Sequence, residues 1–407
     1  MSRILAITGG RLVLTDSVER GDILISGDKI AAIGAFDIPA NAEIIDAKGQ
    51  HVAPGIVDFG VFSVDKKACI AGGITRIALM PDLTPPLDDP GLVQRAALAA
   101  KPDLWVHPLA AATNGLAGTE LAEYGLMRKA GAKAVSTGRN WIADSGVMLR
   151  ALAYAHSLGL VLVSHPEDSG LTRHAVATAG EAATRLGLPH APAAAEAIAM
   201  ARDIALVRET GAALHFRQVT TAAGFDLVRA AKAEGLRITC GISPAHLLLS
   251  DIAVNDYRTY AHLSPPLRAE SDRQAACAAL KDGTIDVLCS AHDPRGPEAK
   301  RLPFADAAPG MAGAETLLAL GLGFVRDELI DLPRLFGLLS GAPSHLLGVN
   351  SGALAKDAPA DLVLFTPETP WQIRGEAFVA SAANTPFEGL PVQGRVTATL
   401  KGGRLLS

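Results

Sequence analysis

Eight short apolar runs, each followed by a stretch with helical spacing, constrain the fold of this chain more than any other feature. The runs span residues 56–59, 74–80, 104–109, 134–136, 161–164, 213–219, 237–242 and 285–290. Apolar strands that alternate with helices are typical of βαβ units around a parallel sheet. Eight such units predict an α/β fold with a closed (β/α)₈ barrel of the TIM type.

Both ends of the chain have a different pattern, that of short β-strands. Residues 1–52 contain several such strands, two of them joined by the hairpin signal Gly27-Asp28. Strand patterns return at 360–365 and 395–406. We therefore predict a small β-sandwich formed from both chain termini, residues 1–53 plus 350–407, beside a barrel domain at 54–349.

Composition narrows the classes of function. The chain has 407 residues, 49% of them hydrophobic, a net charge of −5 and 4% aromatic residues. Interspersed charges and few aromatic rings argue against nucleic-acid binding, and no run reaches the ~18 apolar residues of a membrane span. The four cysteines are widely spaced, which suits reduced thiols. We expect a soluble, cytoplasmic protein with no nucleic acid or membrane as a partner.

In a barrel of this kind the working residues follow the carboxyl ends of the strands. Only two strand ends carry candidate ligands or acids, His165-Pro-Glu167-Asp168 and Ala291-His292-Asp293. Asp293 could orient the His292 imidazole as a general base. A lone histidine such as His165, however, more often makes a structural hydrogen bond. Three basic residues also fall near strand ends, where they could bind an anion or pair internally: Arg139, Arg217 and Arg295.

Several longer motifs, spread over nearly the whole chain, carry a family resemblance. They are Ala53 to Asp58, Ala71 to Thr75, Met80 to Asp82, Pro244 to Leu247, Pro265 to Arg268, Asp282 to Asp286, Gly313 to Thr316, Ala360 to Leu362 and Asn384 to Gly389. Together they resemble a dihydroorotase of the amidohydrolase superfamily, in the branch whose barrel is flanked by a sandwich built from both termini. The resemblance implies a zinc site and hydrolysis of a cyclic amide, interconverting dihydroorotate and carbamoyl-aspartate in pyrimidine synthesis.

The ligands that the resemblance implies are mostly absent. Its two first-strand histidines fall on Gly60 and Phe62, its strand-six histidine on Gln218, and its strand-eight aspartate on Ala291. Its fourth-strand acid or lysine falls within 136–138, and its substrate-binding asparagine is Asp82. Of the ligand positions, only His165 is retained. His246 and Arg268 remain with Asp82 as remnants of the substrate pocket.

These substitutions lead to the expectation of a non-catalytic protein without a metal cofactor. Non-catalytic members that this chain resembles assemble with aspartate carbamoyltransferase, so the resemblance implies that partner and a homo- or hetero-oligomer. One alternative is an active amidohydrolase with a rebuilt site, formed by His165, Glu167, Asp168, His292 and Asp293. Another is a small-molecule sensor whose old pocket is lined by Asp82, Arg217 and Arg295.

Overall fold

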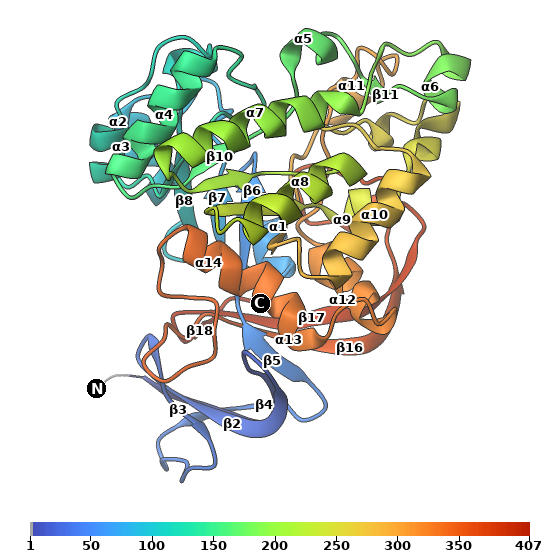
Figure 1. The fold of residues 1–407 in the computed structure, drawn as a ribbon. Helices are drawn as coiled ribbons and strands as arrows, with labels where there is room; N and C mark the ends of the chain where they lie inside the picture. The colour runs from blue at the N-terminus through green and yellow to red at the C-terminus, as the bar shows by residue number, and fades with distance from the viewer. Residues whose placement is uncertain (1–2) are drawn as a thin grey trace.

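A parallel barrel forms the centre of the computed structural model, which describes residues 3–407 (Figure 1). Its strands are β6 (Ile56–Val61), β7 (Ile74–Leu79), β8 (Trp105–Ala111), β9 (Ala134–Ser136), β10 (Leu162–Ser164), β13 (Leu214–Phe216), β14 (Ile238–Ile242) and β15 (Val287–Leu288). They pair in this chain order. Each of the eight apolar runs contains or overlaps one strand, which confirms the predicted barrel.

Asp58 joins the first barrel strand to the segment that follows the last. Its carboxylate accepts a hydrogen bond from the backbone N–H of Ser290, at 2.9 Å, and another from the Ser290 hydroxyl. The backbone N–H of Phe62 also donates to the carbonyl of His292, at 2.9 Å. Asp58 is fully buried, and this burial raises the pKa of its carboxyl group. The aspartate of the Pro54 to Asp58 motif therefore has a structural role in closing the barrel.

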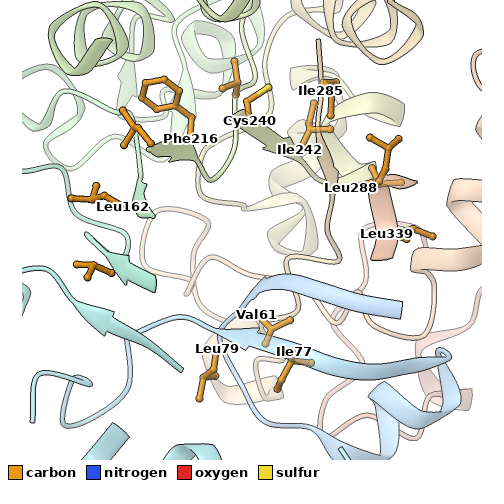
Figure 2. Close-up of a cluster of buried hydrophobic side chains, with 14 of the residues drawn as sticks. Val61, Ile77, Leu79, Leu162, Phe216, Cys240, Ile242, Ile285, Leu288 and Leu339 are labelled. Carbon is orange, nitrogen blue, oxygen red and sulfur yellow. The ribbon is translucent and has the colours of Figure 1, made fainter. Parts of the chain in front are cut away.

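Helices surround the barrel on its outer side. The α-helices of the described residues are α1 (Lys66–Ala71), α2 (Pro90–Leu98), α3 (Tyr124–Lys129), α4 (Ser145–Ser157), α5 (Ser169–Thr172), α6 (Glu181–Leu186), α7 (Ala194–Thr210), α8 (Ala222–Ala233), α9 (Pro244–Leu248), α10 (Glu270–Lys281), α11 (Pro297–Lys300), α12 (Leu317–Arg326), α13 (Leu332–Phe336) and α14 (Ala342–Leu346), of which α5, α6 and α11 lie above the end of the barrel. Figure 2 shows barrel-strand side chains, among them Leu79, Leu162 and Phe216, on the outer side of the ring of strands. There they pack beneath the helices. A separate cluster, which includes Val57, Phe59 and Val163, fills the barrel interior.

Strands from both ends of the chain form a second sheet. They are β1 (Ile4–Val13), β2 (Val18–Ser26), β3 (Lys29–Gly34), β4 (Glu43–Asp46), β5 (His51–Pro54), β16 (Leu362–Gln372), β17 (Pro391–Lys401) and β18 (Arg404–Leu405). The sheet runs β18-β17-β16-β5-β1-β2-β3, with β4 beside β1. Its two ends share one core, in which Ile25 and Ile30 cluster with Leu400, so the sheet curves back on itself. The prediction of one β-rich unit built from both termini is confirmed.

A short pair, β11 (Ala177–Thr178) and β12 (His190–Ala191), lies apart from both sheets. None of the helices between residues 3 and 407 has the length and apolar character that a membrane crossing requires.

Candidate active site at the barrel mouth

A backbone irregularity at Gly60 places Phe62 over the carboxyl end of the barrel. The pairing of β6 with β7 shifts register between Phe59 and Val61, and Gly60 has a φ of 98°, a conformation that favours glycine. As a result Val61 packs outward with the helix-facing core, whereas Phe62 joins the interior cluster. The ring of Phe62 is 7% exposed and covers the interior from above.

Two arginines lie against the Phe62 ring. The guanidinium carbon of Arg139 is 3.6 Å from the ring centroid and that of Arg217 is 5.2 Å away, within reach of a cation–π interaction. Arg139 is also held by Asp293, whose carboxylate pairs with Arg295 at 2.9 Å. One buried carboxylate thus pairs with two cations above the ring, and the cluster keeps a net positive charge.

Arg217 continues this contact network into the barrel. Its Nη2 lies 3.1 Å from Nδ1 of His165, whose Nε2 lies 3.1 Å from Oε2 of Glu167. A guanidinium can only donate and a carboxylate can only accept. We therefore assign His165 the neutral tautomer with its proton on Nε2, which is consistent with the lowering of its pKa by burial. Both ring nitrogens of His165 are then used by protein partners.

Glu167 is fixed from its other side by Arg268, whose Nη2 is 2.7 Å from Oε1. Burial alone would raise the pKa of Glu167, but the hydrogen bond with His165 and the charge of Arg268 outweigh it and lower the pKa to about 2. Arg268 donates further to Thr220 and Thr178 and is 3% exposed. Arg268, which the resemblance implies as a remnant of the substrate pocket, is therefore held by partners within the protein.

Asp82 and His246 also have partners within the protein. Asp82 accepts from the backbone N–H of Arg139 at 2.8 Å, and its close approach depends on Gly138, where a Cβ would lie 2.7 Å from Oδ1. His246 lies 2.9 Å from the Ser243 hydroxyl and 3.1 Å from the Pro265 carbonyl oxygen. Burial lowers the pKa of His246 to about 4, so its imidazole is neutral at pH 7.

His292 turns away from the mouth. Its Nδ1 accepts from the backbone N–H of Ala314 at 3.3 Å, and its Nε2 lies 3.7 Å from a carboxylate oxygen of Asp65, the residue that caps α1. Asp293 points the other way, toward the two arginines over Phe62. The structure does not bring His292 and Asp293 together, so the general-base pair suggested by their adjacency has no geometric support.

Comparison with known proteins identifies the family. The family model described as "Dihydro-orotase-like" matches residues 55–223. A "Dihydroorotase-like protein" of Pseudomonas aeruginosa is 36% identical over 422 residues, which cover 98% of this chain and 99% of the relative. This chain belongs to the dihydroorotase-like family. A "Dihydroorotase" of Pelotomaculum thermopropionicum is 37% identical and covers 99% of this chain and 98% of its own length.

Solved structures agree with the fold of this dihydroorotase-like chain. The L-hydantoinase (dihydropyrimidinase) of Arthrobacter aurescens superposes with a TM-score of 0.88 at 25% identity, covering 100% of this chain and 96% of that one. The dihydropyrimidinase of Brevibacillus agri gives a TM-score of 0.84 at 23% identity, covering 99% and 94%. Together the comparisons place the chain among amidohydrolases with a TIM barrel and a β-sheet domain.

The residues of this dihydroorotase-like chain do not fit the zinc that its family resemblance implies. Phe62, Gln218 and Ala291 line one small cavity of about 10 Å³, which is room for one water molecule at most. The Oε1 atom of Gln218 has no hydrogen-bond partner within the part of the chain that the structure describes. Across residues 3–407, no three His, Cys, Asp or Glu side chains gather as a metal-binding group. His165 has no free lone pair, and the Arg217 guanidinium beside it would repel a cation.

Sequence reasoning missed two features of this site. The sequence predicts Arg139 and Arg217 as basic residues near strand ends, with Arg217 also lining the pocket of a possible sensor, but it gives no sign that both pack against Phe62. Glu196 lies on a helix that the sequence assigns to the barrel exterior, so its position does not point to the site. It is fully buried, and it accepts hydrogen bonds from the backbone and hydroxyl groups of Thr220 and Thr221. The one sequence feature that could have pointed to Glu196 is a glutamate among the alanines of α7.

Glu167→Gln should destabilise the protein in a pH-dependent way. A carboxyl group whose pKa falls from an ordinary 4.5 to about 2 on folding contributes roughly 3 kcal/mol above pH 4.5, and the contribution disappears as pH falls toward 2. The difference in unfolding free energy between the wild type and this variant should therefore be largest at pH 7 and shrink in acid. Urea unfolding at several pH values measures it, with exposed Glu298→Gln as the control. A difference that stays constant with pH would contradict the assigned network.

Proposed function

We propose that this chain is a non-catalytic member of the dihydroorotase-like family and acts as a structural subunit for aspartate carbamoyltransferase in pyrimidine synthesis. The observation that carries the first half is the filled mouth. Where family members would hold a metal ion, Phe62, Gln218 and Ala291 leave about 10 Å³. Without a bound cation there is no metal-activated water of lowered pKa to open a cyclic amide.

The preserved scaffold supports the second half. Asp58 joins the ends of the barrel, and Arg268, which the resemblance implies as a remnant of the substrate pocket, is paired with Glu167. The barrel is closed, but ion pairs within the protein occupy its mouth. This arrangement suits a protein that acts by binding a partner through its surface rather than by binding a substrate in its pocket. The choice of partner rests on the resemblance to non-catalytic members that assemble with aspartate carbamoyltransferase.

Metal content and turnover test the loss of chemistry. Protein purified with zinc in every buffer should carry less than about 0.1 zinc per chain, since its ligand set is incomplete. It should show no hydrolysis of dihydroorotate and no cyclisation of carbamoyl-aspartate, under conditions in which an active dihydroorotase does both. About one zinc per chain, or turnover that His165→Ala abolishes, would overturn the proposal.

Mixing with purified aspartate carbamoyltransferase tests the structural role separately. The two proteins should elute as one complex in size exclusion at micromolar concentration. The complexed transferase should also keep its activity on dilution or heating better than the transferase alone, because a partner that binds only the assembled state stabilises that state. Separate elution, with no change in transferase stability, would contradict the structural role and leave the chemical result standing.

A second candidate is an amidohydrolase with a rebuilt site. A cavity of about 550 Å³ opens above the mouth, lined in part by His165, Glu167 and Arg139, and its size falls within the range of small-molecule sites. Dihydroorotate turnover that both His165→Ala and Asp293→Ala abolish would favour this candidate.

A further inference from the structure

A second large cavity lies at the opposite end of the barrel from the mouth. It has a volume of about 820 Å³ and is bounded by the amino-terminal parts of β7 and β8, by the loop after α14 and by the β17–β18 turn. The barrel and the terminal sheet therefore both contribute to it, and Figure 1 shows that sheet at this end of the barrel. We call this cavity the basal pocket. It shares no residue with the mouth cavities.

The basal pocket is strongly positive in a protein that is negative overall. Its charged lining consists of five cations, Arg76, Lys101, Lys133, Lys401 and Arg404, and two carboxylates, Asp28 and Asp361. Five positive charges less two negative charges leave +3, whereas the whole chain carries −5. A local excess of this size concentrates anions in a concave site.

The floor of the basal pocket is built from buried charges. The Asp361 carboxylate pairs with Arg76 at 2.8 Å and with Lys401 at 2.5 Å, and all three residues are at most 5% exposed. One carboxylate therefore serves two cations, and the floor keeps a positive charge. Burial away from water lowers the pKa of Lys401 to about 8, although the Asp361 carboxylate acts in the opposite direction.

Lysines on the wall of the pocket add positive charge that no ion pair offsets. Neither Lys101 nor Lys133 has an ion-pair partner among the described residues, whereas Arg404 pairs with Asp103 at 2.6 Å. Trp105 positions part of this charge. The guanidinium carbon of Arg76 lies 4.4 Å from the centroid of its ring, and the ammonium nitrogens of Lys401 and Lys101 lie 4.5 and 5.2 Å from it.

We propose that the basal pocket binds a small phosphate-bearing polyanion. Clustered Arg and Lys side chains are the groups that recognise phosphate in proteins, and two lysines without ion-pair partners beside a positively charged floor suit a ligand with several negative charges. The volume of about 820 Å³ lies in the range of small-molecule sites. These features favour a small ligand over an acidic peptide lying across the surface. The inference does not depend on the proposed loss of catalysis or on the transferase.

Pyrophosphate and ATP, without added metal, are suitable probes for calorimetry at low ionic strength. We expect saturable binding of at least one of them to the full chain. The variant Lys101→Gln with Lys133→Gln should weaken it at least ten-fold, because it removes the positive charge that no ion pair offsets and leaves the Asp361 cluster intact. The matched control is Lys67→Gln with Lys281→Gln, which removes two exposed lysines outside the pocket and should bind as the wild type does. Equal melting temperatures of the two double variants would exclude unfolding as the cause.

The fluorescence of Trp105 gives a second readout, because this side chain is 39% exposed in the pocket wall. Ligand binding should change the emission of the wild type and not that of Trp105→Phe. Citrate serves to distinguish phosphate recognition from general anion binding. Absence of binding for both phosphate probes, equal affinity for citrate, an unaffected lysine double variant, or binding confined to a polyglutamate peptide would each overturn the proposal.

Discussion

Asp293→Asn is expected to lower the unfolding free energy by about 3 kcal/mol, because it removes the carboxylate from a buried ion-pair cluster and leaves the cations in place. Asp293 is 4% exposed and pairs with both Arg139 and Arg295. Asparagine keeps the size of the side chain but not its charge. Arg139, stacked on Phe62 with Arg217 nearby, would then lose its ion-pair partner while the neighbouring cations remain.

Urea unfolding measures this loss of stability. Two further variants test whether the loss comes from the ion pairs of Asp293. Asp226→Asn breaks an exposed pair with Arg229 and should cost no more than about 0.5 kcal/mol. Combining Asp293→Asn with Arg139→Gln should cost less than the sum of the two single changes, because the second change removes a cation that the first left unpaired. Strict additivity, or a loss below about 1 kcal/mol for Asp293→Asn, would mean that solvent already screens the cluster.

The barrel could be predicted from sequence because its signals are local. Each buried strand appears as a short apolar run, and helices α7 and α8 are each followed within two residues by a glycine with positive φ, Gly211 and Gly235. The shared terminal sheet could likewise be inferred from matching β-patterns at the two ends of the chain. What periodicity could not show is how that sheet curves until Gly403 meets Gly27.

The content of the mouth depends on contacts between residues far apart in sequence. The sequence shows at which positions the implied ligands are absent. It does not show which other side chains fill the space around those positions. Arg217 is the clearest case, since its place just after β13 gives no sign that its guanidinium will meet His165, 52 positions earlier. The direction of Phe62 depends in turn on the register shift at Gly60, which a strict alternation along the strand does not predict.

The backbone of the mouth has, at one position, a shape suited to the ligand that the family resemblance implies. Ala291 has a φ of 49°, a conformation that aspartate and asparagine adopt more readily than alanine. The resemblance places an aspartate at this position. The backbone therefore still fits the aspartate that the family resemblance implies, and the chemical change lies in the side chains.

We expect that introducing the implied ligands alone will not produce zinc binding, because the Arg217 guanidinium engages the Nδ1 lone pair of His165. The variant Phe62→His, Gln218→His, Ala291→Asp would supply three ligands beside His165, enough for a tetrahedral site. Gly60 is left unchanged because its φ of 98° would strain a histidine. The Nδ1 lone pair of His165 is engaged by the Arg217 guanidinium at 3.1 Å, and a cation about 4 Å from a metal costs roughly 4 kcal/mol per unit of metal charge.

Adding Arg217→Ala to that triple variant should therefore raise zinc content at least ten-fold, from below about 0.1 to near one per chain. Adding Arg295→Ala instead is the matched control: it removes an arginine that contacts the Asp293 carboxylate and does not contact His165, and it should leave the zinc content low. Circular dichroism and melting temperature report whether each variant is folded. If the triple variant binds one zinc with Arg217 in place, the arginine is not the obstacle, and the missing ligands alone account for the lost site.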